Sequence, residues 1–325
     1  MPHYFLGVDG GQSSTTAMIG DETGRVLGVG KGGPCNHAGV SEGRARFIAA
    51  IRSSLEAAGA QANLDAASIR FTSACLGLSG GPADKESILR EILASDRWLV
   101  TDDAVIALAG ATAGEPGVVV ISGTGSIAFG RNSDGRTARA GGWGYLFGDE
   151  GGGFWIARQA LRAALSFEEG WGLATSLRAR LLDSTAGRSM NDLLHRCYTD
   201  EFPRPRIARL ALVVNQAAES GDPVALEILD AAARELALLA VAVRGQLFAA
   251  GAPALVTYSG GVFRSRIVLS CFRKWMAKEA GVQLMPPVFP AHGAAIGALL
   301  EAYRAAGANR AIQDFLYPAP ADGVL

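Results

Sequence analysis

Residues 4–30, YFLGVDGGQSSTTAMIGDETGRVLGVG, carry the main signal of the fold. Its first apolar run ends at Asp9 and meets a Gly-Gly turn, and two further apolar runs follow, separated by the turn residues 21–24. Short apolar runs bounded by Gly, Asp and Ser are typical of β-strands joined by tight turns. The stretch therefore predicts a three-stranded meander with a glycine-rich turn after its first strand.

The same order of elements returns in GVVVISGTGSIAFGRNSDGRTARAGG, residues 117–142, although the letters differ. Helix and strand patterns alternate after each meander, which indicates layered α/β domains. The helical patterns cover 42–59, 84–95, 264–279 and 292–303, and the strand patterns cover 69–80, 97–103, 254–261 and 283–286. A design that occurs twice predicts two similar domains that face each other. We expect one domain at 1–115, joined by a C-terminal helix at about 293–325, and the other at 116–292.

Composition narrows the function classes. The 325 residues include 42 glycines, and 30 basic residues balance 31 acidic ones to a net charge of −1. No basic excess is available to attract nucleic acid or an anionic membrane. The first residues do not resemble a signal peptide, and the most apolar stretch, 236–256, is too polar to span a bilayer. The four scattered cysteines fit reduced thiols in a cytoplasmic protein.

Two glycine turns at strand ends are candidate phosphate loops. Backbone N–H groups beside glycine can approach phosphate oxygens closely, and hydroxyls add donors. Asp9 could also hold a magnesium ion through water. Each turn alone is equally compatible with a plain hairpin, but two at matching places favour a clamp on a polyphosphate from both sides. The candidate residues are Asp9, Gly10, Gly11, Gln12, Ser13, Ser14 and Thr15 in the first turn, and Ser122, Gly123, Thr124, Gly125 and Ser126 in the second.

The segment Thr101-Asp102-Asp103-Ala104 carries two carboxylates where a strand meets a helix. The carboxyl ends of strands are where α/β proteins build active sites. Phosphoryl transfer to an alcohol requires a group that orients and deprotonates the attacking hydroxyl. One of the two acids is expected to cap the helix instead.

Two later glycine-rich segments complete the set. GGWGYLFGDEGGGFWIARQAL, residues 141–161, combines aromatic rings with carboxylates, which suits the apolar faces and hydroxyl rim of a sugar. Its alternative is a loop stabilised by its own aromatics. SGGVF, residues 259–263, could admit a planar base or be a simple strand–helix connection. The histidines show no metal spacing.

These motifs, in this order, resemble N-acetylglucosamine kinases and related glucosamine kinases of the actin, hexokinase and heat-shock-chaperone superfamily. The resemblance runs from about residue 5 to 300 and implies two actin-like, ribonuclease H-like domains around a nucleotide cleft. It implies ATP and magnesium as cofactors, an amino sugar as substrate and a possible homodimer. It makes Asp103 the catalytic base for the 6-hydroxyl and assigns sugar contacts to Asn36, Asp103, Thr124, Gly142, Trp143 and Asp149, and the adenosine motif to Gly260 and Gly261.

Two other functions stay open. The same phosphate motifs occur in ATPases that activate dehydratases and benzoyl-CoA reductase through an iron–sulfur cluster shared by two subunits. The positions of Cys35 and Cys75 fit cluster ligation poorly. A nucleotide-binding sensor without catalysis is the third reading, and the presence of Asp103 argues against it. The motifs do not decide among N-acetylglucosamine, glucosamine and N-acetylmuramic acid.

Overall fold

The computed structural model describes residues 3–11, 14–35, 41–66, 68–80 and 85–308. The chain divides into two compact units, Met1–Glu115 with Pro287–Leu325 (unit 1) and Pro116–Pro286 (unit 2). Residues 287–292, which the sequence assigns to the second domain, group with unit 1. The N–H of Val288 donates to the carbonyl of Ala111 there, at 2.9 Å.

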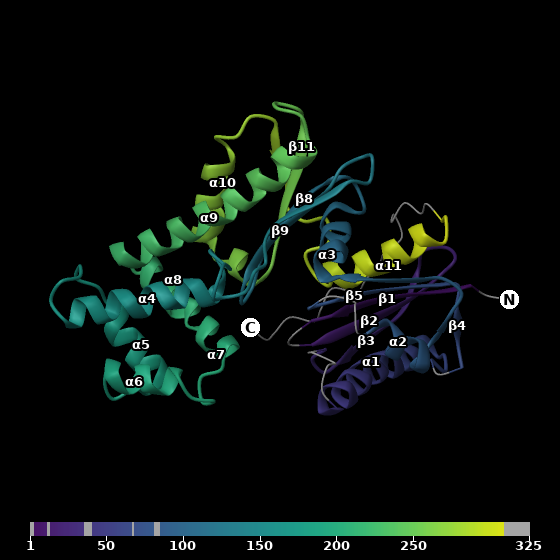
Figure 1. The fold of residues 1–325 in the computed structure, drawn as a ribbon, viewed down its shortest axis with the longest axis horizontal. Coiled ribbons are helices and arrows are strands. Elements are labelled where there is room, and N and C mark those ends of the chain that lie inside the picture. Colours follow the sequence, from purple (N-terminus) through teal and green to yellow (C-terminus); the bar gives the residue numbers. More distant parts are fainter. Residues whose placement is uncertain (1–2, 12–13, 36–40, 67, 81–84, 309–325) are drawn as a thin grey trace. The chain divides into compact units, whose positions relative to one another are not determined.

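Unit 1 is built on a five-stranded mixed sheet in the order β3-β2-β1-β5-β7 (Figure 1). The first three strands form the predicted meander, and the last two run parallel to β1. The strands are β1 Tyr4–Gly10, β2 Thr15–Asp21, β3 Val26–Gly32, β5 Ser73–Leu78 and β7 Trp98–Asp102. The parallel strands all end at one edge of the sheet, and that edge positions the site.

Helices cover both faces of this sheet. On one face α1 (Ser41–Ala62) lies so close to β2 and β3 that a Cβ at Gly30 would be 2.0 Å from the carbonyl oxygen of Ser54. On the other face α11 (Gly293–Ala305) lies against β1 and beside α3 (Asp103–Thr112). Alternation along β1 serves both layers, because Leu6 packs in the core under α1 and Phe5 packs with Leu299 of α11.

Unit 2 repeats the design, since its sheet has the order β10-β9-β8-β11-β12. Again a meander occupies one side, and two strands run parallel to the first strand of the meander. The strands are β8 Gly117–Ser122, β9 Ser126–Arg131, β10 Thr137–Gly141, β11 Ala254–Ser259 and β12 Val282–Leu284. The predicted fold class, two similar domains each with a mixed sheet and flanking helices, is confirmed.

The turn between the second and third strands is the same in both units. The side chain of Asp21 accepts hydrogen bonds from the N–H groups of Thr23 and Arg25, and Gly24 follows at φ 93°. The side chain of Asn132 accepts from Asp134 and Arg136 in the same way, with Gly135 at φ 79°. Short polar side chains that bond the backbone two residues on, with glycine at positive φ, define this turn locally.

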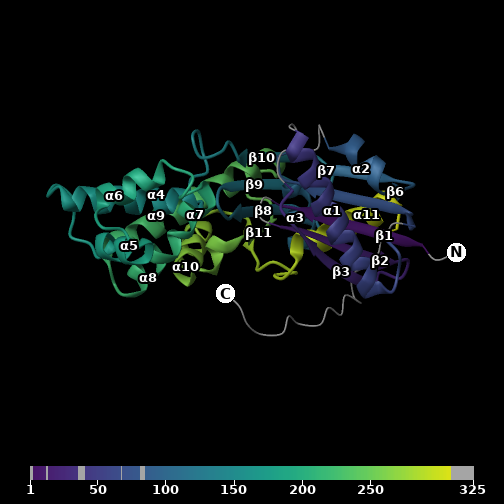
Figure 2. The same ribbon diagram turned by 90° about the horizontal axis from the view of Figure 1, so that it is seen from below.

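The helices of unit 2 form one large core with its sheet (Figures 1 and 2). The longest, α9 (Pro223–Leu247), crosses the sheet, and its start is fixed by Pro223 and by Asp222, whose side chain accepts from Val224 and Ala225. The others are α4 Gly153–Glu168, α5 Leu177–Thr185, α6 Met190–Cys197, α7 Arg204–Arg209, α8 Ala211–Glu219, a 3₁₀ turn η1 Gly261–Arg264, and α10 Arg266–Met276. Among the described helices, none has the length and apolarity needed to cross a membrane.

Two expectations need correction. The strand expected at 69–80 is two strands, β4 (Arg70–Phe71) and β5, and β4 pairs with β6 (Ala94–Ser95). The helix expected at 84–95 is shorter, α2 Glu86–Ile92. The helix predicted at 292–303 is α11, which ends at Ala305, and Gly307 at φ 76° ends it in a left-handed turn; residues 309–325 lie outside the described part of the chain.

Candidate active site

The site of unit 1 lies where β1, β5 and β7 end. Gly10 is paired with Leu78, and Leu78 with Asp102, so the residues that follow these strands are neighbours at one edge. The N–H of Ser79 donates to the carbonyl of Gly10 at 3.0 Å. The Ser79 hydroxyl donates to Oδ2 of Asp103 at 2.5 Å. The sheet therefore brings three segments that are distant in sequence to a single carboxylate.

The two acids of the TDDA segment have different surroundings. Asp102 is exposed at the N-cap position of α3, and its side chain makes no capping hydrogen bond. Asp103 is the first residue of α3, is half-buried and is held by Ser79. Its Oδ1 makes no hydrogen bond within the described residues. Of the two, Asp103 has the fixed orientation that a base requires.

The carboxylate of Asp103 acts on that of Asp9. Burial, and then the nearby charge of Asp103, raise the pKa of Asp9 from 3.8 to about 6. Two acids that repel each other fit a divalent cation such as Mg²⁺, which prefers oxygen ligands and keeps several waters. The residues that the structure describes contain no group of three or more potential metal ligands. Water and phosphate oxygens would therefore complete the shell of such a cation.

The other described residues of the first turn hold the turn in place. The N–H of Gly11 donates to the carbonyl of Ser14 at 3.0 Å, which closes the hairpin. A Cβ at Gly10 would be 2.5 Å from Cδ2 of Leu78, so a larger residue there would force the Leu78 side chain to move. Thr15 is fully buried, and its hydroxyl donates to the carbonyl of Gly33. Ser14 is exposed. Gln12, Ser13 and the candidate sugar residue Asn36 lie outside the described residues.

The second turn, residues 122–126, presents two backbone donors. The N–H of Gly123 donates to the carbonyl of Gly125 across the turn, at 2.9 Å. Within the described part of the chain, the N–H groups of Thr124 and Gly125 make no hydrogen bond, and both residues are half-buried. A Cβ at Gly123 would meet nothing within 4 Å, so the space beside the turn is open. Two adjacent free amides beside open space fit phosphate oxygens.

The turn is fastened to the segment that precedes α4. The Ser122 hydroxyl donates to the carbonyl of Gly151 at 2.8 Å, and the Ser126 hydroxyl to that of Glu150 at 2.6 Å. At the start of α4, the N–H groups of Gly153 and Phe154 donate to the carbonyls of Gly123 and Thr124 at 2.8 and 3.0 Å. The side chains of both serines and the backbone carbonyls of Gly123 and Thr124 thus hold the loop.

The SGG segment lies beside this turn. Because β8 and β11 are parallel neighbours, Ser259 is paired with Ile121 and the two loops leave the sheet together. Gly260 has φ 101°, and a Cβ there would be 2.2 Å from the carbonyl oxygen of Ser122. Gly261 has open space where its Cβ would be. Unit 2 therefore brings the candidate phosphate residues beside Gly260 and Gly261, to which the resemblance assigns the adenosine.

The aromatic segment follows β10 and leads to a buried acid. Gly142 has φ 74°, and Trp143 is 65% exposed, with the guanidinium of Arg139 lying 4.6 Å from its ring centre. Asp149 is 5% exposed and adopts φ 65°. Its Oδ1 accepts from the N–H of Ser126 at 3.3 Å, and its Oδ2 pairs with Arg204. Asp149 therefore touches the candidate phosphate loop as well as lying in the segment predicted to bind sugar.

Sequence reasoning missed three residues that the structure adds. Ser79 follows a buried strand, and the polar residues at strand ends could have identified it. Lys85 is 1% exposed and donates to the carbonyl of Ser79 at 2.8 Å. Arg204 lies on α7, 55 residues from Asp149, and no local pattern distinguishes it from the other arginines of that helix.

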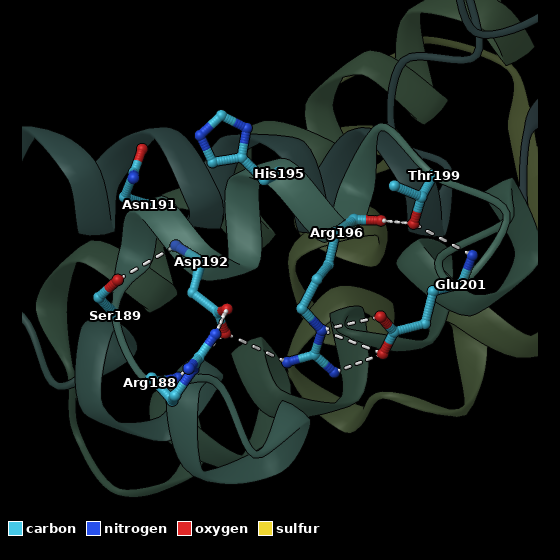
Figure 3. A pocket seen from close by; sticks show the side chains of 8 residues that line it. All are labelled: Arg188, Ser189, Asn191, Asp192, His195, Arg196, Thr199 and Glu201. Atoms are coloured by element: carbon cyan, nitrogen blue, oxygen red, sulfur yellow. Dashed lines mark hydrogen bonds and ion pairs between the residues drawn. The ribbon is translucent and has the colours of Figure 1, made fainter.

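A surface pocket elsewhere in unit 2 contains none of the predicted residues. It is lined by α6 and the turn after it, and its walls are joined by ion pairs of Arg196 with Asp192 and Glu201 (Figure 3). These ion pairs compensate the charge of Arg196 within the pocket. The lining residues are Arg188, Ser189, Asn191, Asp192, His195, Arg196, Thr199 and Glu201.

Comparisons with known proteins agree with this geometry. A profile of the BadF/BadG/BcrA/BcrD ATPase family matches residues 6–302. The N-acetylmuramic acid/N-acetylglucosamine kinase of Clostridium acetobutylicum is 35% identical over 84% of this chain and 90% of its own. The N-acetyl-D-glucosamine kinase of Dictyostelium discoideum is 31% identical over 71% and 76%. The crystal structure of a candidate N-acetylglucosamine kinase from Chromobacterium violaceum superposes with a TM-score of 0.73 at 29% identity, covering 92% and 98%.

Proposed function

Because the chain belongs to the BadF/BadG/BcrA/BcrD ATPase family, we propose that it is a sugar kinase that transfers the γ-phosphoryl group of ATP to the 6-hydroxyl of an amino sugar. N-acetylglucosamine is the substrate we propose first, because both curated relatives are named for it. Free glucosamine and N-acetylmuramic acid are the alternatives. The reaction takes place in the cytoplasm, where ATP is available.

One observation carries the proposal: Asp103 is a half-buried carboxylate held by Ser79 at a strand edge that also presents Asp9. A nucleotide-binding sensor has no need of an oriented base at this edge. In the reaction Asp103 accepts the proton of the 6-hydroxyl as that oxygen bonds to the γ-phosphorus. The bond from the γ-phosphorus to the bridging oxygen breaks, and ADP leaves.

The other residues bind and orient the substrates. The free amides of Thr124 and Gly125 donate to phosphate oxygens, and Gly260 and Gly261 allow the nucleoside to approach the backbone. When bound, Mg²⁺ neutralises phosphate charge, and Asp9 would hold it through water. The exposed ring of Trp143 offers an apolar face to the sugar.

The test is a coupled ADP-release assay over N-acetylglucosamine, glucosamine, N-acetylmannosamine, N-acetylmuramic acid and glucose. We expect sugar-dependent ADP release that is highest with N-acetylglucosamine, and NMR of the product should show phosphate on O6. ATP hydrolysis measured without sugar is the control. ADP release that no sugar stimulates would reject the kinase, and phosphate on O1 would reject the assigned geometry.

The iron–sulfur ATPase activator finds no support at Cys35 and Cys75. Cys35 and Cys75 are fully buried, and the Cys35 sulfur lies 2.9 Å from the Thr15 hydroxyl. Burial raises the pKa of both thiols, so neither is a ready thiolate ligand. Ligands shared between two subunits must reach the surface, and these two do not.

A further inference from the structure

Arg204 connects helix α7 to residues 122–126, the candidate phosphate loop of unit 2. It is the first residue of α7, a short helix between α6 and α8, and α7 packs against the start of α4. The contact is close, since a Cβ at Gly153 would lie 3.1 Å from the carbonyl oxygen of Ala208. Both Gly153 and the next residue, Phe154, donate backbone hydrogen bonds to the loop.

The Arg204 guanidinium makes two contacts that both lead to residues 123–126. It pairs with Oδ2 of Asp149, whose Oδ1 accepts from the N–H of Ser126. It also lies 5.1 Å from the ring centre of Tyr145, which packs edge-on against the ring of Phe154. One side chain therefore supports both sides of the turn that holds the free amides of Thr124 and Gly125.

The buried carboxylate of Asp149 lies beside the loop, so its negative charge has to be compensated by a nearby cation. Its carboxylate lies so close to Gly125 that a Cβ there would be 2.4 Å from Oδ2. An uncompensated negative charge beside the peptide that receives phosphate would repel the nucleotide, and little water is present to screen it. Among the described residues, Arg204 is the one cation seen to pair with Asp149.

We propose that Arg204 is a positioning residue for nucleotide binding: it cancels the charge of Asp149 and fixes the Thr124–Gly125 amides for the phosphates. This inference rests on the proposed function, which assigns the loop to ATP. It changes the expected role of Asp149, because the motif resemblance assigns that residue to the sugar. The pair makes Asp149 a support of the phosphate loop as well.

The experiment measures binding of Mg·ADP by isothermal titration calorimetry, which requires no sugar. Arg204→Met should raise the Kd for ADP roughly 10- to 50-fold. Arg204→Lys keeps the positive charge but loses the planar guanidinium, so its Kd should lie between those of the wild type and Arg204→Met. Asp149→Asn alone should change it by less than about fivefold, because the amide oxygen can still accept from Ser126. The double variant Arg204→Met/Asp149→Asn should recover most of the loss, since no charge is left to cancel.

Arg206→Met is the matched control. Arg206 belongs to the same short helix, stacks on Phe202 and donates to the carbonyl of Glu201, with no contact to the loop. The Arg206→Met variant should bind ADP with a Kd within about twofold of that of the wild type. Equal losses in the Arg204 and Arg206 variants, or an undiminished loss in the double variant, would overturn the proposal.

Steady-state kinetics distinguish a role of Arg204 in nucleotide binding from a role in sugar binding. A rise in the KM for sugar with unchanged ADP binding in Arg204→Met would also overturn it, since Arg204 would then serve the sugar alone. If Arg204→Met does not fold, the lysine and double variants still decide. If wild type binds ADP but phosphorylates no sugar, the kinase assignment fails and the Arg204 result stands on its own.

Discussion

At the scale of single residues, the two adjacent acids of the TDDA segment provide a direct test of catalysis. Asp103→Asn keeps the shape and the Ser79 contact but removes the base, so kcat should fall roughly 10²- to 10⁴-fold with ADP binding nearly unchanged. Steady-state kinetics with N-acetylglucosamine provide the measurement.

The neighbouring acid is the control for this variant. Asp102→Asn alters an exposed side chain that makes no capping hydrogen bond and should leave kcat within about twofold. A large loss in Asp102→Asn with normal turnover in Asp103→Asn would move the base to Asp102.

Asp9 should make stability depend on pH. Its folded pKa of about 6 lies above its ordinary 3.8, so the native state holds this proton more tightly than the unfolded chain. Its contribution to stability is complete below about pH 4 and is lost as the pH rises through 6. At pH 8, Asp9→Asn should therefore be more stable than the wild type by about 1 to 3 kcal/mol. Urea unfolding without nucleotide or magnesium, at pH 4 and pH 8, measures the difference.

The same variant should lose activity while it gains stability, because the asparagine cannot take the place of the carboxylate beside a magnesium ion. Lower stability of Asp9→Asn at pH 8, or an equal gain at pH 4, would contradict the assigned cause.

At the scale of elements, α3 and α11 pack backbone to backbone. A Cβ at Gly297 would be 1.8 Å from the carbonyl oxygen of Ile106, and one at Gly110 would be 1.7 Å from that of Gly293. Gly297→Ala must push the helices apart, and we expect it to lower the free energy of unfolding by about 2 to 4 kcal/mol. Chemical denaturation followed by circular dichroism measures the change.

Gly245 offers a matched control for Gly297. It lies inside α9, is exposed, and has no atom within 4 Å of where its Cβ would be. Gly245→Ala should therefore stabilise the protein by about 0.5 to 1 kcal/mol, because alanine favours the helix. A destabilising Gly245→Ala together with a neutral Gly297→Ala would refute the close packing of α3 on α11.

At the scale of the whole molecule, the four cysteines report on folding and on the rival function. Cys35 and Cys75 are buried, and Cys197 and Cys271 are partly exposed. A thiol reagent should therefore modify about two of the four groups in the native protein and all four in guanidinium. We also expect the purified protein to be colourless. Rapid native reaction of Cys35, or iron that co-purifies with the protein, would revive the activator hypothesis.

The overall architecture was more predictable from the sequence than the ends of its elements. Both meanders, their turns and the two-domain α/β class were predicted correctly, because apolar alternation and glycine turns are local signals. The ends of elements were less predictable. The strand expected at 69–80 divides because residues 70–71 pair with β6, and a partner that is distant in sequence leaves no mark on the segment itself.

Short motifs with their own chemistry identified the candidate residues from the sequence alone: the Gly-Gly turn after Asp9 and the SGTGS turn for phosphate, and the acids of TDDA for the acceptor hydroxyl. The contacts that support these motifs come from segments distant in the chain and are visible only in the folded protein. Ser79 reaches Asp103 across 24 residues, and Arg204 reaches Asp149 across 55. The first pair forms because parallel strands end at a common edge of the sheet, and the second because a helix packs over a loop. Neither arrangement can be inferred from the local sequence of a single segment.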